Sequence, residues 1–230
     1  LPISAEEPVF NLVTPRSRCP NCEAPIAARH NIPVISWLVL RGRCAHCRTP
    51  ISVRYPLVEL FTAVASILVL ATFGYTWLGA AALVFTWSII VLTCIDLDTK
   101  LLPDNLTLSL LWMGLLVNLA GGFIDLASAV IGAVAGYLLL WSIYWAFKLL
   151  TRKEGMGYGD FKLLAALGAW FGWQTLPVLA LISSVVGIVL GGGFLLARRS
   201  REAIPFGPFL AIAGWVTLLA HDRVIAFVFG

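Results

Sequence analysis

The sequence predicts an all-α polytopic membrane protein with a small zinc-binding subdomain at its N-terminal end. Apolar residues make up 60% of the chain and charged residues only 12%, whereas soluble domains carry about 25% charged residues. Beyond residue 55 the chain is a series of apolar runs separated by short polar breaks, and before it the chain is polar and holds four of the five cysteines. We therefore expect a zinc-binding subdomain, residues 1–55, and a transmembrane helical bundle, residues 56–230.

Seven apolar runs are interpreted as membrane-spanning helices, because about 20 apolar residues cross a hydrocarbon core of ~30 Å. They cover residues 56–73, 78–95, 105–123, 126–149, 161–173, 176–197 and 205–220. The run 161–173 is the shortest of them. Gly132 with Gly136, and Gly168 with Gly172, have the spacing of small residues that is typical of close helix contacts in membranes. We expect these glycines to pack helices of the bundle together.

The positions of Lys and Arg predict the orientation of these helices, because cytoplasmic loops attract basic residues. If the cysteine region is cytoplasmic, all of the 16 basic residues except Arg223 fall on the cytoplasmic side. The outer turns 74–77, 124–125 and 173–174 contain none. The net charge of +4 reflects this distribution, and we expect lipid, and no nucleic acid, as a partner.

Four cysteines form two C-x-x-C pairs inside an internal repeat. The string R-C-x-x-C-x-x-P-I begins at Arg18 and recurs at Arg43. Each pair directs two thiolates at one ion, and two pairs complete a tetrahedral structural site whose binding stabilises a small region. Disulfide pairing is the alternative, and a cytoplasmic location disfavours it. We expect zinc to be bound by Cys19, Cys22, Cys44 and Cys47.

Acidic residues are scarce, twelve in the chain, and two clusters of them stand at predicted cytoplasmic ends of spans. Asp96 ends the second span and Asp160 opens the fifth, so a folded bundle can bring them together at one membrane depth. Ionisable groups at that depth are costly and usually functional. Two carboxylates held close share a proton, so one can activate a water while the other protonates a leaving amine. The pair is therefore a candidate for hydrolysis.

Several residues near this pair have candidate roles of their own. Gly159, beside Asp160, lets a substrate backbone approach the carboxylate. Asp104, which follows a proline and precedes an apolar run, is interpreted as a helix N-cap. Asp98 is interpreted as a second capping residue or a solvated one, and Glu59 as a member of a structural ion pair or a substrate contact.

Two other chemistries fit parts of this pattern. Asp96, Asp98 and Asp104 could chelate Mg²⁺ for a lipid-diphosphate reaction, but that interpretation leaves the Gly-x-Gly-Asp string unexplained. A glycine loop that cradles phosphate would carry the G-x-x-x-x-G-K-[ST] pattern, which this glycine-rich segment lacks. Both alternatives are weaker than the paired carboxylates.

The ordered set of motifs resembles that of the bacterial type IV prepilin peptidases, which are membrane aspartic proteases with a Gly-x-Gly-Asp motif. The motifs lie between Asn11 and Trp215: the two C-x-x-C pairs, R-Y-P-L-V-E from Arg54, D-L-D from Asp96 followed by L-L-P-D, G-M-G-Y-G-D-F-K from Gly155, and P-F-G-P from Pro205. The family usually has one more hydrophobic span before the cysteine region. The sequence lacks it, so we expect such a span upstream of Leu1.

The resemblance implies an aspartic endopeptidase of the bacterial inner membrane, with catalytic aspartates at Asp96 and Asp160. It implies that type IV prepilins and type II secretion pseudopilins are substrates, cut on the cytoplasmic side after a short basic leader. It also implies N-methylation of the new N-terminus with S-adenosylmethionine, for which no motif marks a site. Supporting residues are then expected at Gly157, Gly159, Lys162, Asp98 and Glu59. The alternative function is a non-enzymatic membrane zinc scaffold for pilus or secretion assembly.

Overall fold

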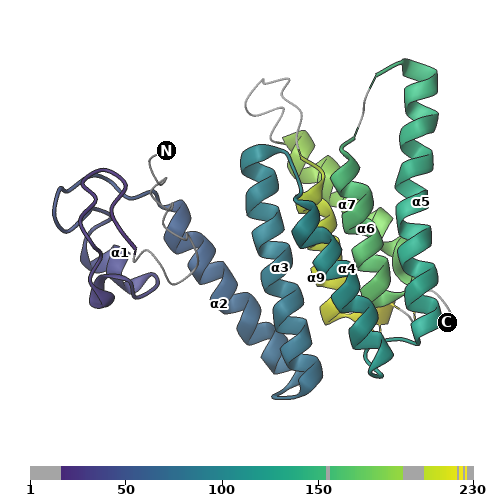
Figure 1. The fold of residues 1–230 in the computed structure, drawn as a ribbon, viewed down its shortest axis with the longest axis horizontal. Helices are drawn as coiled ribbons and strands as arrows, with labels where there is room; N and C mark the ends of the chain where they lie inside the picture. Colours follow the sequence, from purple (N-terminus) through teal and green to yellow (C-terminus); the bar gives the residue numbers. More distant parts are fainter. Residues whose placement is uncertain (1–16, 154–155, 194–204, 222, 225, 227–230) are drawn as a thin grey trace, which may run out of the picture. The chain divides into compact units, whose positions relative to one another are not determined.

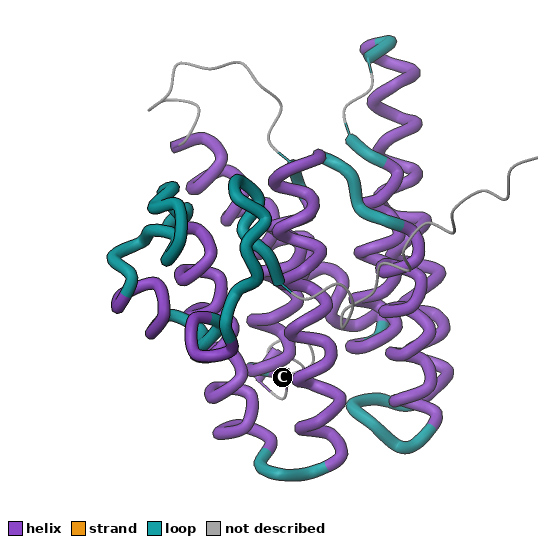
Figure 2. The backbone as a smooth tube through the Cα atoms, turned by 60° about the vertical axis from the view of Figure 1, so that its left-hand side comes forward, coloured by secondary structure: helices purple, strands orange, loops and turns teal. Residues whose placement is uncertain are grey.

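The computed structural model describes residues 17–153, 156–193, 205–221, 223, 224 and 226. The chain divides into two compact units, Leu1–Ala65 and Ser66–Gly230. The described residues of both units form helices and no β-strand (Figure 2), and the N-terminal unit has two isolated β-bridges. The all-α fold class is therefore confirmed for the described part of the chain.

The N-terminal unit contains two knuckles of the same backbone geometry. In each, the N–H of the first cysteine, Cys19 or Cys44, donates to the carbonyl five residues further on, at 3.0 and 2.9 Å. The carbonyl of the same cysteine accepts the N–H of Glu23 or of Arg48, and both of these residues have a φ of 56°. An isolated β-bridge closes each knuckle. The internal repeat in the sequence is thus a repeat of two tight turns.

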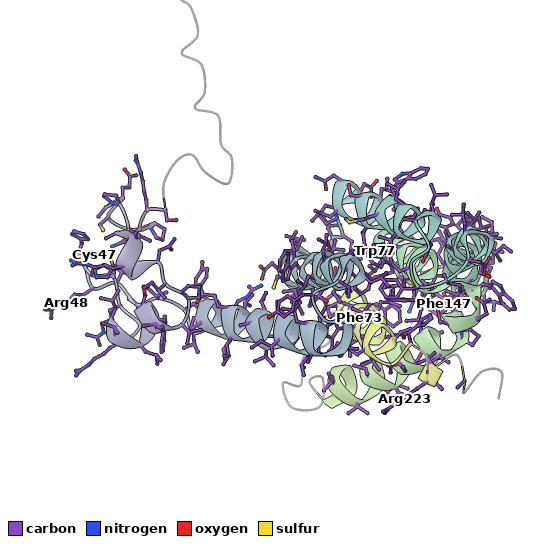
Figure 3. The ribbon with its side chains drawn as sticks, turned by 90° about the horizontal axis from the view of Figure 1, so that it is seen from below. Cys47, Arg48, Phe73, Trp77, Phe147 and Arg223 are labelled. Atoms are coloured by element: carbon purple, nitrogen blue, oxygen red, sulfur yellow. The ribbon has the colours of Figure 1, made fainter. Side chains whose placement is uncertain are left out.

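Short helices connect the knuckles and lead out of them. The 3-10 helix η1 (Ala28–His30) and the single-turn helix α1 (Ile35–Val39) lie between the knuckles, and the long helix α2 (Arg54–Phe73) follows the second. The Trp37 indole N–H donates to the carbonyl of Ile51 at 3.1 Å and so ties α1 to the second knuckle. Few described side chains of this unit are buried, and Arg48 points outward (Figure 3).

The second unit is a bundle of helices that run alternately up and down (Figure 1). Its elements are α3 (Trp77–Thr99), α4 (Asp104–Leu119), α5 (Leu126–Thr151), α6 (Tyr158–Phe171), the 3-10 turn η2 (Trp173–Thr175), α7 (Leu176–Val186) with its π-helical continuation η3 (Gly187–Gly191), and α9 (Gly207–Leu219). The last turns of α3 and α5 and the first turns of α4, α6 and α9 lie at one end of the bundle, the upper end in Figure 1. We call this the upper end below.

Helix α6 is the centre of the bundle. Every residue from Phe161 to Phe171 except Lys162 is buried, and the helix packs against α4, α5 and α9. The ring of Phe85, from α3, lies 4.8 Å from the ring of Trp170 and 5.3 Å from that of Phe171. A helix that is apolar all round is expected to be buried in this way.

Glycines let α5 and α6 approach to backbone contact. A Cβ on Gly132 would overlap the carbonyl oxygen of Gly168. A Cβ on Gly136 would lie 2.7 Å from the carbonyl oxygen of Leu164. The predicted helix contact is therefore confirmed for these three glycines. Gly172 belongs to the same contact, because the Cβ on Gly132 would lie 2.7 Å from its carbonyl carbon, and it also ends α6 with a φ of 81°.

The membrane character of the chain is confirmed, while the number of spans stays a prediction. Four described segments are long and apolar enough to cross a bilayer: Arg54–Phe73, Trp77–Thr99, Leu126–Thr151 and Trp173–Gly191. They correspond to four predicted runs, of which 176–197 extends beyond the described residues. The runs 105–123 and 205–220 form shorter helices, α4 and α9. Helix α6 has 14 residues, and at 1.5 Å per residue its length is about 21 Å, less than a core of ~30 Å.

Candidate active site and metal centre

Asp96 lies in the last turn of α3 and is 4% exposed. Helix α3 ends there because Lys100 takes a left-handed conformation, φ 57°, and its N–H returns to the Asp96 carbonyl at 2.8 Å. No described residue gives the buried Oδ2 of Asp96 a hydrogen bond. The backbone of Gly207, at the start of α9, lies against this carboxylate, and a Cβ there would overlap Oδ2.

Asp160 lies in the first turn of α6 and is 7% exposed. Gly157 is the N-cap residue of the helix, and its carbonyl accepts the N–H of Asp160 at 3.2 Å. A negative charge in the first turn of a helix interacts favourably with the helix dipole. The position of Asp160 in the first turn of α6 therefore favours the charged form of its carboxylate through the helix dipole.

The last turn of α3, which carries Asp96, and the first turn of α6, which carries Asp160, both lie at the upper end of the bundle (Figure 1), as the sequence predicts. Leu102, in the segment between α3 and α4, packs against a glycine beside each aspartate. A Cβ on Gly159 would lie 2.7 Å from the Leu102 Cβ, and a Cβ on Gly207 would lie 3.2 Å from its Cδ1. The glycines next to Asp160 and Asp96 thus share one apolar neighbour.

The structure corrects the interpretation of Asp104. Helix α4 begins at Asp104, its N-cap residue is Pro103, and no side chain caps it. The Asp104 carboxylate instead forms an ion pair with the ammonium group of Lys162, on α6, at 2.5 Å. Asp98 is exposed near the end of α3. The glycine-rich segment is described from residue 156 onward, so Gly155 lies outside the described residues.

Glu59 lies on α2 in the N-terminal unit, where its carboxylate accepts the N–H of Val34 at 2.8 Å. Val34 has a φ of 59°, a conformation that is unfavourable for a β-branched residue. The hydrogen bond compensates part of that strain, which gives Glu59 a structural role with a backbone partner. A substrate contact for Glu59 stays a prediction.

The four cysteines of the knuckles form a cluster that fits a metal ion. Their sulfur atoms all lie within 4.8 Å of one another, and the Cys19 and Cys47 sulfurs are 3.8 Å apart. Zn–S bonds of about 2.3 Å in a tetrahedral site separate the sulfurs by about 3.8 Å. None of the four forms a disulfide. The predicted ligand set is therefore brought together.

The surroundings of Cys47 favour the thiolate, which is the form that binds metals. Hydrogen bonds from the hydroxyl and the N–H of Thr49, and then from the amide of Asn21, lower the pKa of Cys47 to about 5. The Thr49 hydroxyl lies 3.2 Å from the sulfur and the Asn21 amide nitrogen 3.7 Å from it. Asn21 belongs to the other knuckle, so this contact also joins the two turns.

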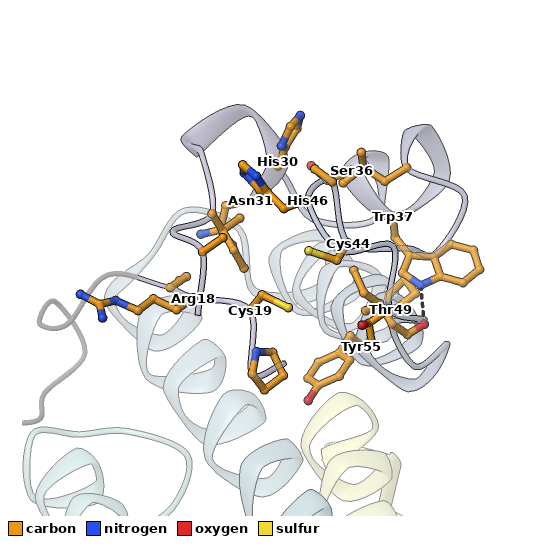
Figure 4. Close-up of a pocket in the computed structure, with 18 of the residues that line it drawn as sticks. Arg18, Cys19, His30, Asn31, Ser36, Trp37, Cys44, His46, Thr49 and Tyr55 are labelled. Carbon is orange, nitrogen blue, oxygen red and sulfur yellow. Dashed lines mark hydrogen bonds between the residues drawn. The ribbon is translucent and has the colours of Figure 1, made fainter. Parts of the chain in front are cut away.

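The N-terminal unit also contains a partly open cavity of about 580 Å³ (Figure 4). Among its lining residues are the aromatic side chains of Trp37 and Tyr55, the imidazole of His46 and the carboxylate of Glu59. Small-molecule sites have volumes of roughly 300–1,000 Å³. No motif in the sequence indicated this cavity, because its walls come from both knuckles, α1 and the start of α2.

Comparison with known proteins gives consistent results. The model of the type IV leader peptidase family matches residues 83–192, and that of the bacterial peptidase A24 N-terminal domain matches residues 3–73. A prepilin leader peptidase/N-methyltransferase of Aeromonas hydrophila is 62% identical over 95% of this chain and 76% of its own length. Proteins of the same name from Stutzerimonas stutzeri and Pseudomonas aeruginosa are 55% and 52% identical, over 98% and 95% of this chain and 79% and 76% of their own lengths. No solved structure matches the chain.

Proposed function

The chain belongs to the type IV leader peptidase family, and we propose that it is a membrane aspartic endopeptidase that removes the leader peptide of prepilins and N-methylates the new N-terminus. The observation that carries the proposal is the position of Asp96 and Asp160. Two buried carboxylates from distant parts of the chain lie at the same end of a membrane bundle, each beside a glycine that packs on Leu102. Such a pair is costly to bury and suits acid–base chemistry.

In the proposed reaction one aspartate is ionised and the other is protonated, because neighbouring carboxylates do not readily ionise together. The ionised aspartate takes a proton from a water molecule, whose oxygen attacks the carbonyl carbon of the scissile peptide bond. The protonated aspartate donates a hydrogen bond to the carbonyl oxygen, and a proton then passes to the leaving amine as the C–N bond breaks. The freed amine is the group that is methylated.

We propose zinc as the metal of the four-cysteine cluster. The sulfur spacing suits Zn–S bonds, and four thiolates fill a tetrahedral site without an open position. The ion would therefore have a structural role, holding the two knuckles of the N-terminal unit together. In this proposal residues 1–55 form the zinc-binding subdomain and residues 56–230 the catalytic bundle.

We propose that the methyl donor, S-adenosylmethionine, binds in the cavity of the N-terminal unit. The cavity volume suits a ligand of that size. The rings of Trp37 and Tyr55 suit the face of an adenine, and the Glu59 carboxylate suits the hydroxyls of a ribose. When bound, the donor supplies the methyl group for the amine that cleavage exposes.

We propose that the upper end of the bundle lies at the cytoplasmic face of the bacterial inner membrane. Lys100 ends α3 there and Lys148 lies in the last turn of α5, and cytoplasmic ends of spans are enriched in such residues. Lipid would surround the bundle. The basic leaders of prepilins and of type II secretion pseudopilins would then reach Asp96 and Asp160 from the cytoplasm.

The test is cleavage of a purified prepilin in detergent by the full-length protein and by its Asp96→Asn and Asp160→Asn variants, without added Mg²⁺. We expect each variant to lose about 100-fold to 10,000-fold in rate, the range that acid–base groups of this kind contribute. Thermal unfolding should stay unchanged. Asp125→Asn, at the opposite end of the bundle, is the control, since Asn also caps a helix.

The outcomes separate the candidate functions. Normal turnover in either variant would exclude the aspartate pair. A requirement for added divalent metal would favour the Mg²⁺ site. Absence of cleavage by the unsubstituted protein, combined with loss of partner binding in cysteine variants, would favour the non-enzymatic scaffold.

A further inference from the structure

We propose that Asp104 and Lys162 form a positioning pair, whose ion pair holds Asp96 and Asp160 in their reactive geometry. The inference rests on the proposed function, because it assigns a role to residues around the same pair of carboxylates. Neither side chain needs to touch the substrate. Both are expected to act through the elements that carry the aspartates.

The ion pair closes a ring of structure around the site. The chain runs from Asp96 through Leu102 to Asp104, which is the first residue of α4. The Asp104 carboxylate contacts the ammonium group of Lys162, and Lys162 stands two residues after Asp160 on α6. Asp96 and Asp160 are therefore joined by two short stretches of backbone and one ionic contact.

The first turn of α6 depends on contacts from outside the helix. Its N-cap residue, Gly157, has no side chain, and among the described residues no side chain caps the turn. Gly159 gives the turn no side chain either, and its backbone packs on Leu102. The Tyr158 ring lies 5.3 Å from that of Tyr144, on one side of the turn. The ion pair of Lys162, at the start of the second turn, joins this end of α6 to α4.

The expected sizes of the effects on stability and on the rate constant distinguish a positioning role from a stabilising one. The side chains of Lys162 and Asp104 are 26% and 61% exposed, and ion pairs in contact with water add little to stability. Catalysis is far more sensitive to geometry, because a displacement of about 1 Å at the reacting groups can cost about 100-fold in rate. Loss of the ion pair should therefore change the rate constant much more than the melting temperature.

The experiment compares Asp104→Asn, Lys162→Gln, Lys162→Arg and the charge-swapped double variant Asp104→Lys with Lys162→Asp, all in the full-length protein. The measurements are kcat and KM for prepilin cleavage and the melting temperature in detergent. We expect the two neutral variants to lose about 10–100-fold in kcat, with KM and melting temperature close to those of the unsubstituted protein. Lys162→Arg should retain most of the activity. The swapped variant should recover at least about tenfold relative to the single variants.

A matched control is Lys153→Gln, which removes an exposed positive charge at the same end of the bundle. It should leave kcat unchanged, so that a general effect of charge on binding basic leaders is excluded. Full activity in both neutral variants would overturn the proposal. The proposal would also be wrong if the loss of kcat in the swapped variant equalled the combined losses of the two single variants. A fall in melting temperature that parallels the fall in kcat would contradict it as well.

The same panel separates this inference from the proposed function. An inactive Asp96→Asn variant beside a fully active Asp104→Asn variant would overturn the positioning pair alone. An active Asp96→Asn variant would overturn the proposed function itself.

Discussion

The helical bundle buries large side chains around α6, whereas the N-terminal unit leaves most of its described side chains exposed. Phe85, Phe161 and Trp170 are fully buried in the bundle. In the N-terminal unit the apolar side chains of α1 are largely exposed, and Cys19 is one of the few that are buried. Figure 3 shows the same contrast, with side chains filling the spaces between the bundle helices.

This difference teaches that the two units are stabilised by different interactions. A segment with so little apolar burial does not offset its loss of conformational entropy without a crosslink or a metal. A metal ion bound by the four sulfurs would provide such a link between two turns that are otherwise held by a few hydrogen bonds. The bundle instead depends on close packing and on buried polar groups that are hydrogen-bonded. Each unit should therefore fail under a different perturbation.

Removal of the metal should have the largest effect, because it should destabilise the N-terminal unit and leave the bundle stable. We expect chelation, or the substitution Cys44→Ser, to unfold the N-terminal unit while the bundle persists, since metal binding and folding are coupled in small metal domains. Limited trypsin digestion measures this. Cleavage at Arg29 and Arg48 should become rapid, and a fragment containing the bundle should survive.

Cys94→Ser is the matched control, because Cys94 lies on α3 outside the cluster. It should leave the metal content and the digestion pattern unchanged. If the N-terminal unit stayed resistant to trypsin after metal analysis showed complete removal, the contrast between the units would be wrong.

A polar substitution in the bundle should have the next largest effect. The Asn118 amide nitrogen donates to the carbonyls of Ala169 and Trp170 at 2.8 and 3.1 Å. Its oxygen accepts the N–H groups of Phe123 and Ile124 at 2.9 and 3.1 Å. Asn118→Ala removes four hydrogen bonds, two of them buried, which should lower the free energy of unfolding by about 2–3 kcal/mol.

Thermal unfolding of the bundle, followed by circular dichroism in detergent, measures the change. Asn105→Ala, an exposed amide on the same helix, should alter the melting temperature little. Equal shifts in the two variants would show that the polar contacts of Asn118 do not stabilise the bundle.

The smallest expected effect is on the binding of the methyl donor, and it tests whether donor binding in the N-terminal unit is independent of cleavage in the bundle. Tyr55→Ala removes an aromatic ring from the cavity of the N-terminal unit. We expect binding of S-adenosylmethionine, measured by calorimetry, to weaken about twofold to tenfold, the range for loss of one aromatic contact. Prepilin cleavage should be retained. Tyr75→Ala is the control, because Tyr75 is almost fully exposed in a turn of the bundle, and equal affinities in both variants would argue against the cavity as the donor site.

The sequence predicts best those features that depend on local spacing. Two C-x-x-C pairs with the same flanking residues predict two similar turns, and the structure has them. Alternation of apolar runs and basic loops predicts that Asp96 and Asp160 share one end of the bundle. The catalytic roles of both residues stay predictions.

Features that depend on which helices are neighbours could not be predicted. The ion pair of Asp104 with Lys162, the position of Leu102 and the contacts of Asn118 all join elements that are distant in sequence. Helix α6 is apolar on every face, so no periodicity indicates which side meets α4 or α5. A proline before Asp104 suggested an N-cap, but the proline itself holds that position.

The shortness of α6 has a consequence for the dependence of the protein on its bilayer. Because neighbouring helices rather than lipid surround α6, its depth is set by protein contacts, and the acyl-chain length of the lipid acts first on the longer outer helices α3 and α5. In vesicles of graded thickness these outer helices can tilt to match the thickness of the hydrocarbon core. The distance between the Asp160 carboxylate and the Leu102 segment then stays the same. A membrane that thickens or thins as bacteria adjust their lipids would then leave the centre of the bundle undisturbed.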